Sequence, residues 1–116
     1  MMSSHYMQTI DVAHPRRQPQ QVEDELDAAL SKVRNHSTLR AVKVIHGYGS
    51  SGKGGATKET VKNWAYQRRR HLRATIAGEN YDLFSDETQE MRDECGQMND
   101  PDLGAANPGV TVLWVR

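Results

Sequence analysis

The apolar run from Leu39 to Ile45, "LRAVKVI", is the segment that most restricts the fold. Its residues are nearly all apolar and do not alternate with polar ones, which is typical of a central strand covered on both faces. The segment before it, from Pro19, has a helical period instead, with one apolar face formed by Val22, Leu26, Ala29, Leu30 and Val33. A buried strand that follows an amphipathic helix favours an α/β sandwich.

The other segments extend this pattern. "MQTIDVAH" predicts a first strand that Pro15 ends, because proline cannot donate to a sheet ladder. "KETVKNWAYQRRRHL" predicts a helix capped by Thr57, with Leu72 at the end of its buried side. "RATIAG" predicts a weaker strand, "SDETQEMRDECGQM" an acidic helix capped by Ser85, and "VTVLWV" a last strand. The sequence thus predicts one domain over residues 1–116: a small two-layer β-α-β-α-β sandwich with a mixed four-stranded sheet, a flexible N-terminus over residues 1–7 and an acidic segment over residues 78–109.

The net charge of zero hides an asymmetry along the chain. Residues 1–77 hold 13 Lys and Arg against 6 Asp and Glu, whereas residues 78–116 hold 2 against 9. A basic part of this kind favours contact with nucleic acid. The alternative is that the two parts attract each other and stabilise the fold.

The composition excludes several classes of protein. No apolar run approaches the roughly 20 residues of a membrane helix, so we expect no membrane association. The first residues lack the basic and apolar parts of a secretory signal, and the single Cys95 can form neither an internal disulfide nor a structural zinc site. We therefore expect a cytoplasmic protein.

The glycine-rich stretch "IHGYGSSGKGG" comes directly after the apolar strand. Gly47, Gly52 and Lys53 match a nucleotide-binding P-loop, but Gly54 replaces the Ser or Thr whose hydroxyl holds Mg²⁺. This argues against nucleotide hydrolysis. Glycines still let the backbone approach a phosphate, the following helix N-terminus favours anions, and Lys53 adds a cation. We expect the phosphate of a nucleic-acid backbone at this loop, bound by Gly47, Gly49, Gly52, Lys53 and Gly54.

These motifs resemble the Smr (small MutS-related) domain. The family has a His-Gly-x-Gly motif, here His46-Gly47-Tyr48-Gly49, after its second strand. "IDVAHP" stands where the family has an acidic Asp-x-His-Gly motif, and "NPGVTVLWVR" resembles its C-terminal strand. The resemblance implies an α/β fold like the C-terminal domain of the third bacterial translation initiation factor. It also implies nucleic-acid binding, with DNA-nicking or RNA-cleaving activity in several members, and Asp11, His14 and His46 as the matching functional positions.

The spacing departs from the family, because this chain has Asp-x-x-His, and Pro15 replaces the glycine. On a regular strand Asp11 and His14 would point to opposite faces, so they can meet only if the strand bulges or ends. His46 suits acid–base work on a phosphodiester, and Asp11 could orient a histidine or hold a cation. The alternatives are that His46 braces the loop and that His14 is a surface residue. No cofactor is required; a divalent cation could bind, but nothing in the sequence demands it.

The densest basic patch is "RRRHLR", in which Arg69 and Arg73 would share one helix face at i, i+4. We expect these two arginines to contact phosphate. The alternatives are that they complement the helix dipole or pair with the acidic segment. Two functions therefore stay open: a nucleic-acid-binding domain with endonuclease activity on RNA or DNA, or a non-catalytic module that binds nucleic acid, the ribosome or a protein.

Overall fold

The computed structural model describes residues 5–48 and 53–116. Helices and strands alternate along the chain, with two short 3-10 turns, η1 and η2, on either side of the third strand. Their bounds are β1 Met7–Asp11, α1 Pro19–Arg34, β2 Ala41–Ile45, α2 Lys53–Gln67, η1 Arg69–His71, β3 Leu72–Ala77, η2 Gly78–Asn80, α3 Asp86–Cys95 and β4 Val110–Val115.

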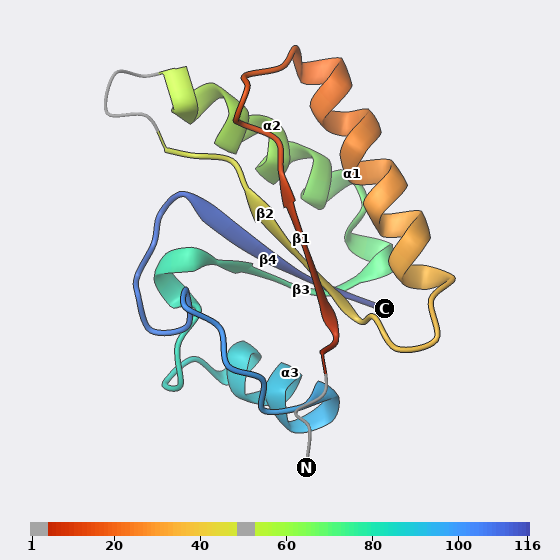
Figure 1. Ribbon diagram of the computed structural model, residues 1–116, viewed down its shortest axis with the longest axis vertical. Helices are drawn as coiled ribbons and strands as arrows, with labels where there is room; N and C mark the ends of the chain where they lie inside the picture. The colour runs from red at the N-terminus through yellow and green to blue at the C-terminus, as the bar shows by residue number, and fades with distance from the viewer. Residues whose placement is uncertain (1–4, 49–52) are drawn as a thin grey trace.

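The four strands form one mixed sheet in the order β1-β2-β4-β3 (Figure 1). β1 and β2 are parallel, and their register pairs Met7 with Ala41 and Asp11 with Ile45. β4 lies between β2 and β3 and runs antiparallel to both. This confirms the predicted α/β class and the mixed four-stranded sheet.

α1 and α2 cover one face of the sheet, where most of the apolar residues lie (Figure 1). The helix faces predicted from the 3.6-residue period pack onto the inner residues of β2 and β4. Trp64 of α2 is 1% exposed, and its indole nitrogen donates a hydrogen bond to Asp27 of α1 at 2.9 Å. The members of this core include Val22, Leu26, Leu30, Val33, Val42, Val44, Val61, Trp64, Leu113 and Val115.

α3 and the connection from Gly96 to Gly109 cover the opposite face, as the lower part of Figure 1 shows. This second layer explains why the run in β2 is apolar on both sides. Tyr6 and Met7 are buried here, at 2% and 1% exposure, so these two residues of the N-terminus that was predicted to be flexible are packed in the core. This core comprises Tyr6, Met7, Ala41, Ala74, Ile76, Tyr81, Met91, Met98, Val112 and Trp114.

Two predicted boundaries are wrong. α2 begins at Lys53, so Thr57 lies inside the helix and cannot cap it. The helix ends at Gln67, and Leu72 is the first residue of β3, paired with Val115. The reason is a change of period: Leu72, Ala74 and Ile76 are buried alternately, as a strand requires. Ser85 caps α3 as predicted, with its hydroxyl oxygen accepting from the Thr88 amide.

Candidate functional site

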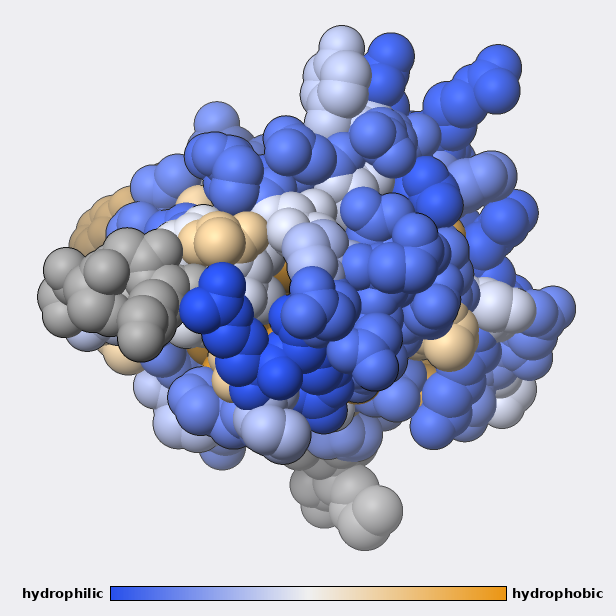
Figure 2. Space-filling model, turned by 90° about the horizontal axis from the view of Figure 1, so that it is seen from above, coloured by the Kyte–Doolittle hydropathy of each residue, from blue (hydrophilic) through white to orange (hydrophobic). Residues whose placement is uncertain are grey.

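The parallel pairing of β1 and β2 brings their carboxyl ends together at one end of the sheet. Asp11 is paired with Ile45, which directly precedes His46, and the Val12 amide donates to the Ile45 carbonyl at 2.9 Å. Figure 2 looks onto this end of the molecule, where most of the surface is hydrophilic. The two predicted motifs therefore share one polar end of the domain.

Asp11 and His14 are in contact despite their spacing. β1 ends at Asp11, and the carboxylate oxygen Oδ1 accepts from the amides of Ala13 at 2.8 Å and His14 at 3.0 Å. This turn reverses the chain, so that Nδ1 of His14 lies 3.0 Å from Oδ2 of Asp11. Because the strand ends at Asp11, the two side chains meet even with the Asp-x-x-His spacing.

The Asp11–His14 pair is open to solvent. The side chains are 37% and 72% exposed, respectively. Burial acts to raise the pKa of Asp11, but hydrogen bonds from the Ala13 amide and from the ring and amide of His14 outweigh it, so the pKa is lowered. Asp11 is therefore an ionised acceptor that orients the imidazole through Nδ1. No hydrogen bond joins Nε2 to any of the described residues.

His46 has the opposite environment, with an exposed fraction of 0%. Nδ1 lies 2.6 Å from the Gly47 carbonyl, which can only accept, so Nδ1 carries the proton. Nε2 then accepts from the Thr111 hydroxyl at 2.8 Å. Burial lowers the pKa of His46, a nearby Lys58 lowers it further, and the bond to Gly47 opposes them only in part. The ring is thus neutral, with both nitrogens bound.

The His46 ring fixes the start of the glycine loop against the approach to β4. The amides of His46 and Gly47 both donate to the Gly109 carbonyl, at 2.9 and 3.0 Å. Gly47 has φ of 68°, a conformation that side chains disfavour. A Cβ on Gly109 would lie 3.5 Å from the Cα of Gly47, so the two backbones approach closely, and 3.4 Å from the Tyr48 ring. Tyr48, which follows, is 56% exposed.

The remaining loop residues are placed only in part. Gly49 and Gly52 lie outside the described residues. Lys53 and Gly54 are the first two residues of α2, so the loop does lead into a helix N-terminus. Lys58, one turn later, donates to the Pro108 carbonyl at 2.9 Å and links α2 to the connection before β4.

Arg69 and Arg73 lie at the other end of the sheet, and they do not share a helix face. Arg69 belongs to η1 and Arg73 to β3. Ala77 pairs with Thr111, the contact of His46, and Arg73 lies four positions before Ala77 on the strand, a rise of about 13 Å. Arg73 forms an ion pair with Glu94 at 3.2 Å, so this arginine does pair with the acidic segment.

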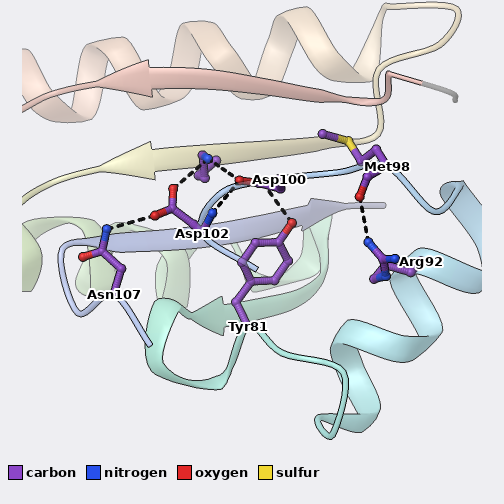
Figure 3. Close-up of polar contacts among 7 residues, drawn as sticks. Tyr81, Arg92, Met98, Asp100, Asp102 and Asn107 are labelled. Carbon is purple, nitrogen blue, oxygen red and sulfur yellow. Dashed lines mark hydrogen bonds and ion pairs between the residues drawn. The ribbon is translucent and has the colours of Figure 1, made fainter. Parts of the chain in front are cut away.

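A buried ionic cluster, which the sequence did not indicate, lies under the sheet (Figure 3). Lys43 of β2 is 7% exposed, and its ammonium group donates to Asp100 and Asp102, both at 2.7 Å. The Tyr81 hydroxyl donates to Asp100 at 3.0 Å, and the Asn107 amide to Asp102. The only sequence signal is a single lysine within an apolar strand.

The cluster anchors the connection between α3 and β4. Burial acts to lower the pKa of Lys43, but the hydrogen bonds to the two aspartates outweigh it and raise the pKa. The bond from Lys43 lowers the pKa of Asp102. Lys43 and Asp102 are therefore both charged, and their contacts fix the backbone before Gly109, which meets the His46 loop.

Within the described part of the chain, no three His, Cys, Asp or Glu side chains are grouped so that they could hold a metal ion. Asp11 is thus a single carboxylate beside one imidazole. The same residues include no helix long and apolar enough to cross a membrane.

The fold matches a solved structure. A crystal structure of the Smr domain of MutS2 from Thermus thermophilus aligns with a TM-score of 0.57, over 94% of this chain and 98% of that chain, at 19% sequence identity. No family model and no curated protein matches the sequence. At this identity the match establishes the fold, and the chain therefore has the α/β fold of an Smr domain.

Proposed function

We propose that the domain binds nucleic acid at the end of the sheet where β1 and β2 finish. The observation that carries this proposal is the convergence of the exposed Asp11–His14 pair with the braced loop that leads into α2. Amides at a helix N-terminus bind anions, and Lys53 adds a positive charge to that first turn. Tyr48 is exposed directly after His46 and Gly47, whose amides are held by the Gly109 carbonyl, and its ring can stack on a base.

An aromatic substitution tests the binding site. Fluorescence anisotropy with a labelled 20-nucleotide single strand, as RNA and as DNA, gives the dissociation constant Kd over a range of salt concentrations. We expect Kd to rise with salt, and Tyr48→Ala to weaken binding about tenfold through lost stacking. Phe84→Ala is the matched control, because Phe84 is 92% exposed and precedes α3 on the opposite face. Equal effects of the two substitutions, or no binding by the native chain, would reject the site.

We further propose that the Asp11–His14 pair cleaves the bound phosphodiester. Nδ1 of His14 is held by Asp11, so Nε2 can take the proton of the attacking hydroxyl or give one to the leaving oxygen. Helix and loop amides would stabilise the added charge on the phosphate. His46 is a positioning residue in this scheme, since both of its ring nitrogens are already bound.

Cleavage of labelled RNA and nicking of supercoiled DNA test this step at saturating protein. We expect His14→Ala to reduce turnover by at least 100-fold, the general range for acid–base catalysis, with Kd nearly unchanged. The control is His5→Ala, an exposed histidine before β1. Parallel reactions with Mg²⁺ and with a chelator decide whether a cation is needed. Binding without turnover by the native chain would instead establish the non-catalytic module.

A further inference from the structure

A row of arginines lines the opposite end of the sheet from the proposed site. α1 and α2 both end there, β2 and β3 begin there, and β4 finishes there (Figure 1). The topology therefore collects basic residues from five elements or their flanks, although they are far apart in sequence. They are Arg34, Arg40, Arg68, Arg73 and Arg116, with Arg69 and Arg70 beside them.

Three surface hollows join along this row. The first, about 770 Å³, is lined by Arg40, Arg73 and Arg116 above Trp114. The second also contains Arg40 and Arg116 and adds Arg34. The third contains Arg34 and extends to Arg68. Because neighbouring hollows share these residues, they adjoin one another, and we call the three hollows together the arginine groove.

The groove keeps an excess of positive charge. Two carboxylate side chains line it, and each is already bound: Asp27 pairs with Arg68 at 3.1 Å, and Glu94 with Arg73 at 3.2 Å. For Arg34, Arg40 and Arg116, no carboxylate of the described residues lies within the 4.0 Å of an ion pair. Arg40 binds only backbone carbonyl oxygens, so its charge is not neutralised, and the groups of Arg34 and Arg116 remain available to an anion.

Aromatic rings and backbone contacts hold several of these guanidinium groups in place. Arg73 lies over the Trp114 ring at 5.3 Å, and Arg69 over the exposed Tyr66 ring at 4.1 Å. Arg40 donates to the carbonyl oxygens of Leu39 and Ser37, at 2.7 and 3.1 Å. A positioned guanidinium loses less entropy when it binds phosphate, and arginine beside an aromatic ring is a common platform for single-stranded nucleic acid.

We propose that the arginine groove is a second binding surface for a nucleic-acid strand, separate from the site at the carboxyl ends of β1 and β2. A row of guanidinium groups along a groove matches a series of phosphates on one backbone. The Arg73 end of the groove is about 13 Å of strand from the residues that contact His46, so the two surfaces are separate in space. This inference goes beyond the proposed site and shares with it only the class of partner.

The test compares two double substitutions that remove the same charge. In Arg34→Gln/Arg116→Gln, both residues line the groove, and neither guanidinium bonds to another described residue. In Lys32→Gln/Lys62→Gln, two exposed lysines of α1 and α2 outside the three hollows are replaced. Both variants should have the same melting temperature as the native chain, because the replaced side chains make no hydrogen bond or ion pair with a described residue. The probe is a labelled 20-nucleotide single strand.

Loss of two phosphate contacts should weaken binding about tenfold at 0.1 M salt and reduce the slope of log K against log salt by roughly 1.4 in the groove variant. The lysine variant should change Kd less than twofold. Equal losses in both variants would overturn the proposal, because net charge alone would explain them. If polyglutamate bound to the native chain as tightly as the nucleic acid, an acidic protein would be the better partner and the proposal would fail.

Tyr48→Ala separates this inference from the proposed function. If Tyr48→Ala weakens binding and the groove variant does not, the proposed site stands and the groove is rejected. If only the groove variant weakens binding, the groove is confirmed and the site at Tyr48 fails. Native protein that binds neither RNA nor DNA would overturn both.

Discussion

His14 and His46 follow neighbouring parallel strands, yet their environments are opposite. His14 is exposed, contacts one carboxylate and keeps Nε2 for a ligand. His46 is fully buried, and its two nitrogens are bound by Gly47 and Thr111. The first ring therefore has one nitrogen that no described residue binds, as the proposed acid–base role requires, while the second ring fixes a loop. The presence of a histidine in a sequence motif therefore does not by itself show that the residue acts as an acid or a base.

The largest expected effect concerns Lys43, which is buried as His46 is. Replacing Lys43 with Met leaves Asp100 and Asp102 without their cation under the sheet. We expect the free energy of unfolding to fall by about 3–5 kcal/mol, as when one partner of a buried ion pair is removed. Urea denaturation measures it, with the exposed Lys62→Met as the control. A loss below about 1 kcal/mol would mean that the cluster does not fix the connection to β4.

The second prediction compares the two histidines directly. His46→Ala removes a buried ring and leaves the Thr111 hydroxyl and the Gly47 carbonyl without partners, so we expect a loss of about 2–4 kcal/mol in the free energy of unfolding. His14→Ala should cost under about 1 kcal/mol, because Asp11 keeps its two backbone donors. Urea denaturation of both variants measures the contrast. Similar losses would contradict the assignment of separate roles.

The smallest effect concerns pH. Since burial lowers the pKa of His46 in the folded chain, the unfolded chain takes up this proton first as the pH falls. The stability that neutral His46 contributes is therefore complete above about pH 6.5 and is lost as the pH falls toward the folded pKa, by up to about 1.4 kcal/mol per pH unit. Denaturation at pH 7.0 and 5.5 tests this. His46→Gln should remove this part of the pH dependence, and an unchanged dependence would refute the buried neutral ring.

The fold could be predicted from sequence because its signals are local. The helical period from Val22 to Val33 and the apolar run of β2 each report burial within one segment. Both ends of α2 were predicted wrongly. Thr57 resembled a helix cap, and the basic run before Leu72 resembled a continued helix, but Leu72 pairs with Val115 in the sheet.

The site could be predicted only in part. The positions of Asp11 and His14 followed from motifs, but their contact depends on where β1 stops, which is decided by the turn after it. The arrangement around Lys43 joins residues 57 and 59 positions apart in the sequence, so no local pattern reports it. The position of Arg73 could not be predicted, because it depends on the sheet order, in which β4 lies between β2 and β3.

That sheet order also bears on synthesis of the chain. Val110–Val115 is the only strand paired with β3 and the only link between β3 and the β1–β2 pair among the described residues. While a ribosome is still translating the residues before it, β3 has no neighbour in the sheet, and one edge of β2 is unpaired. The domain therefore completes its sheet only after β4 has left the exit tunnel, and until then the nascent chain exposes strand edges to which other chains can pair.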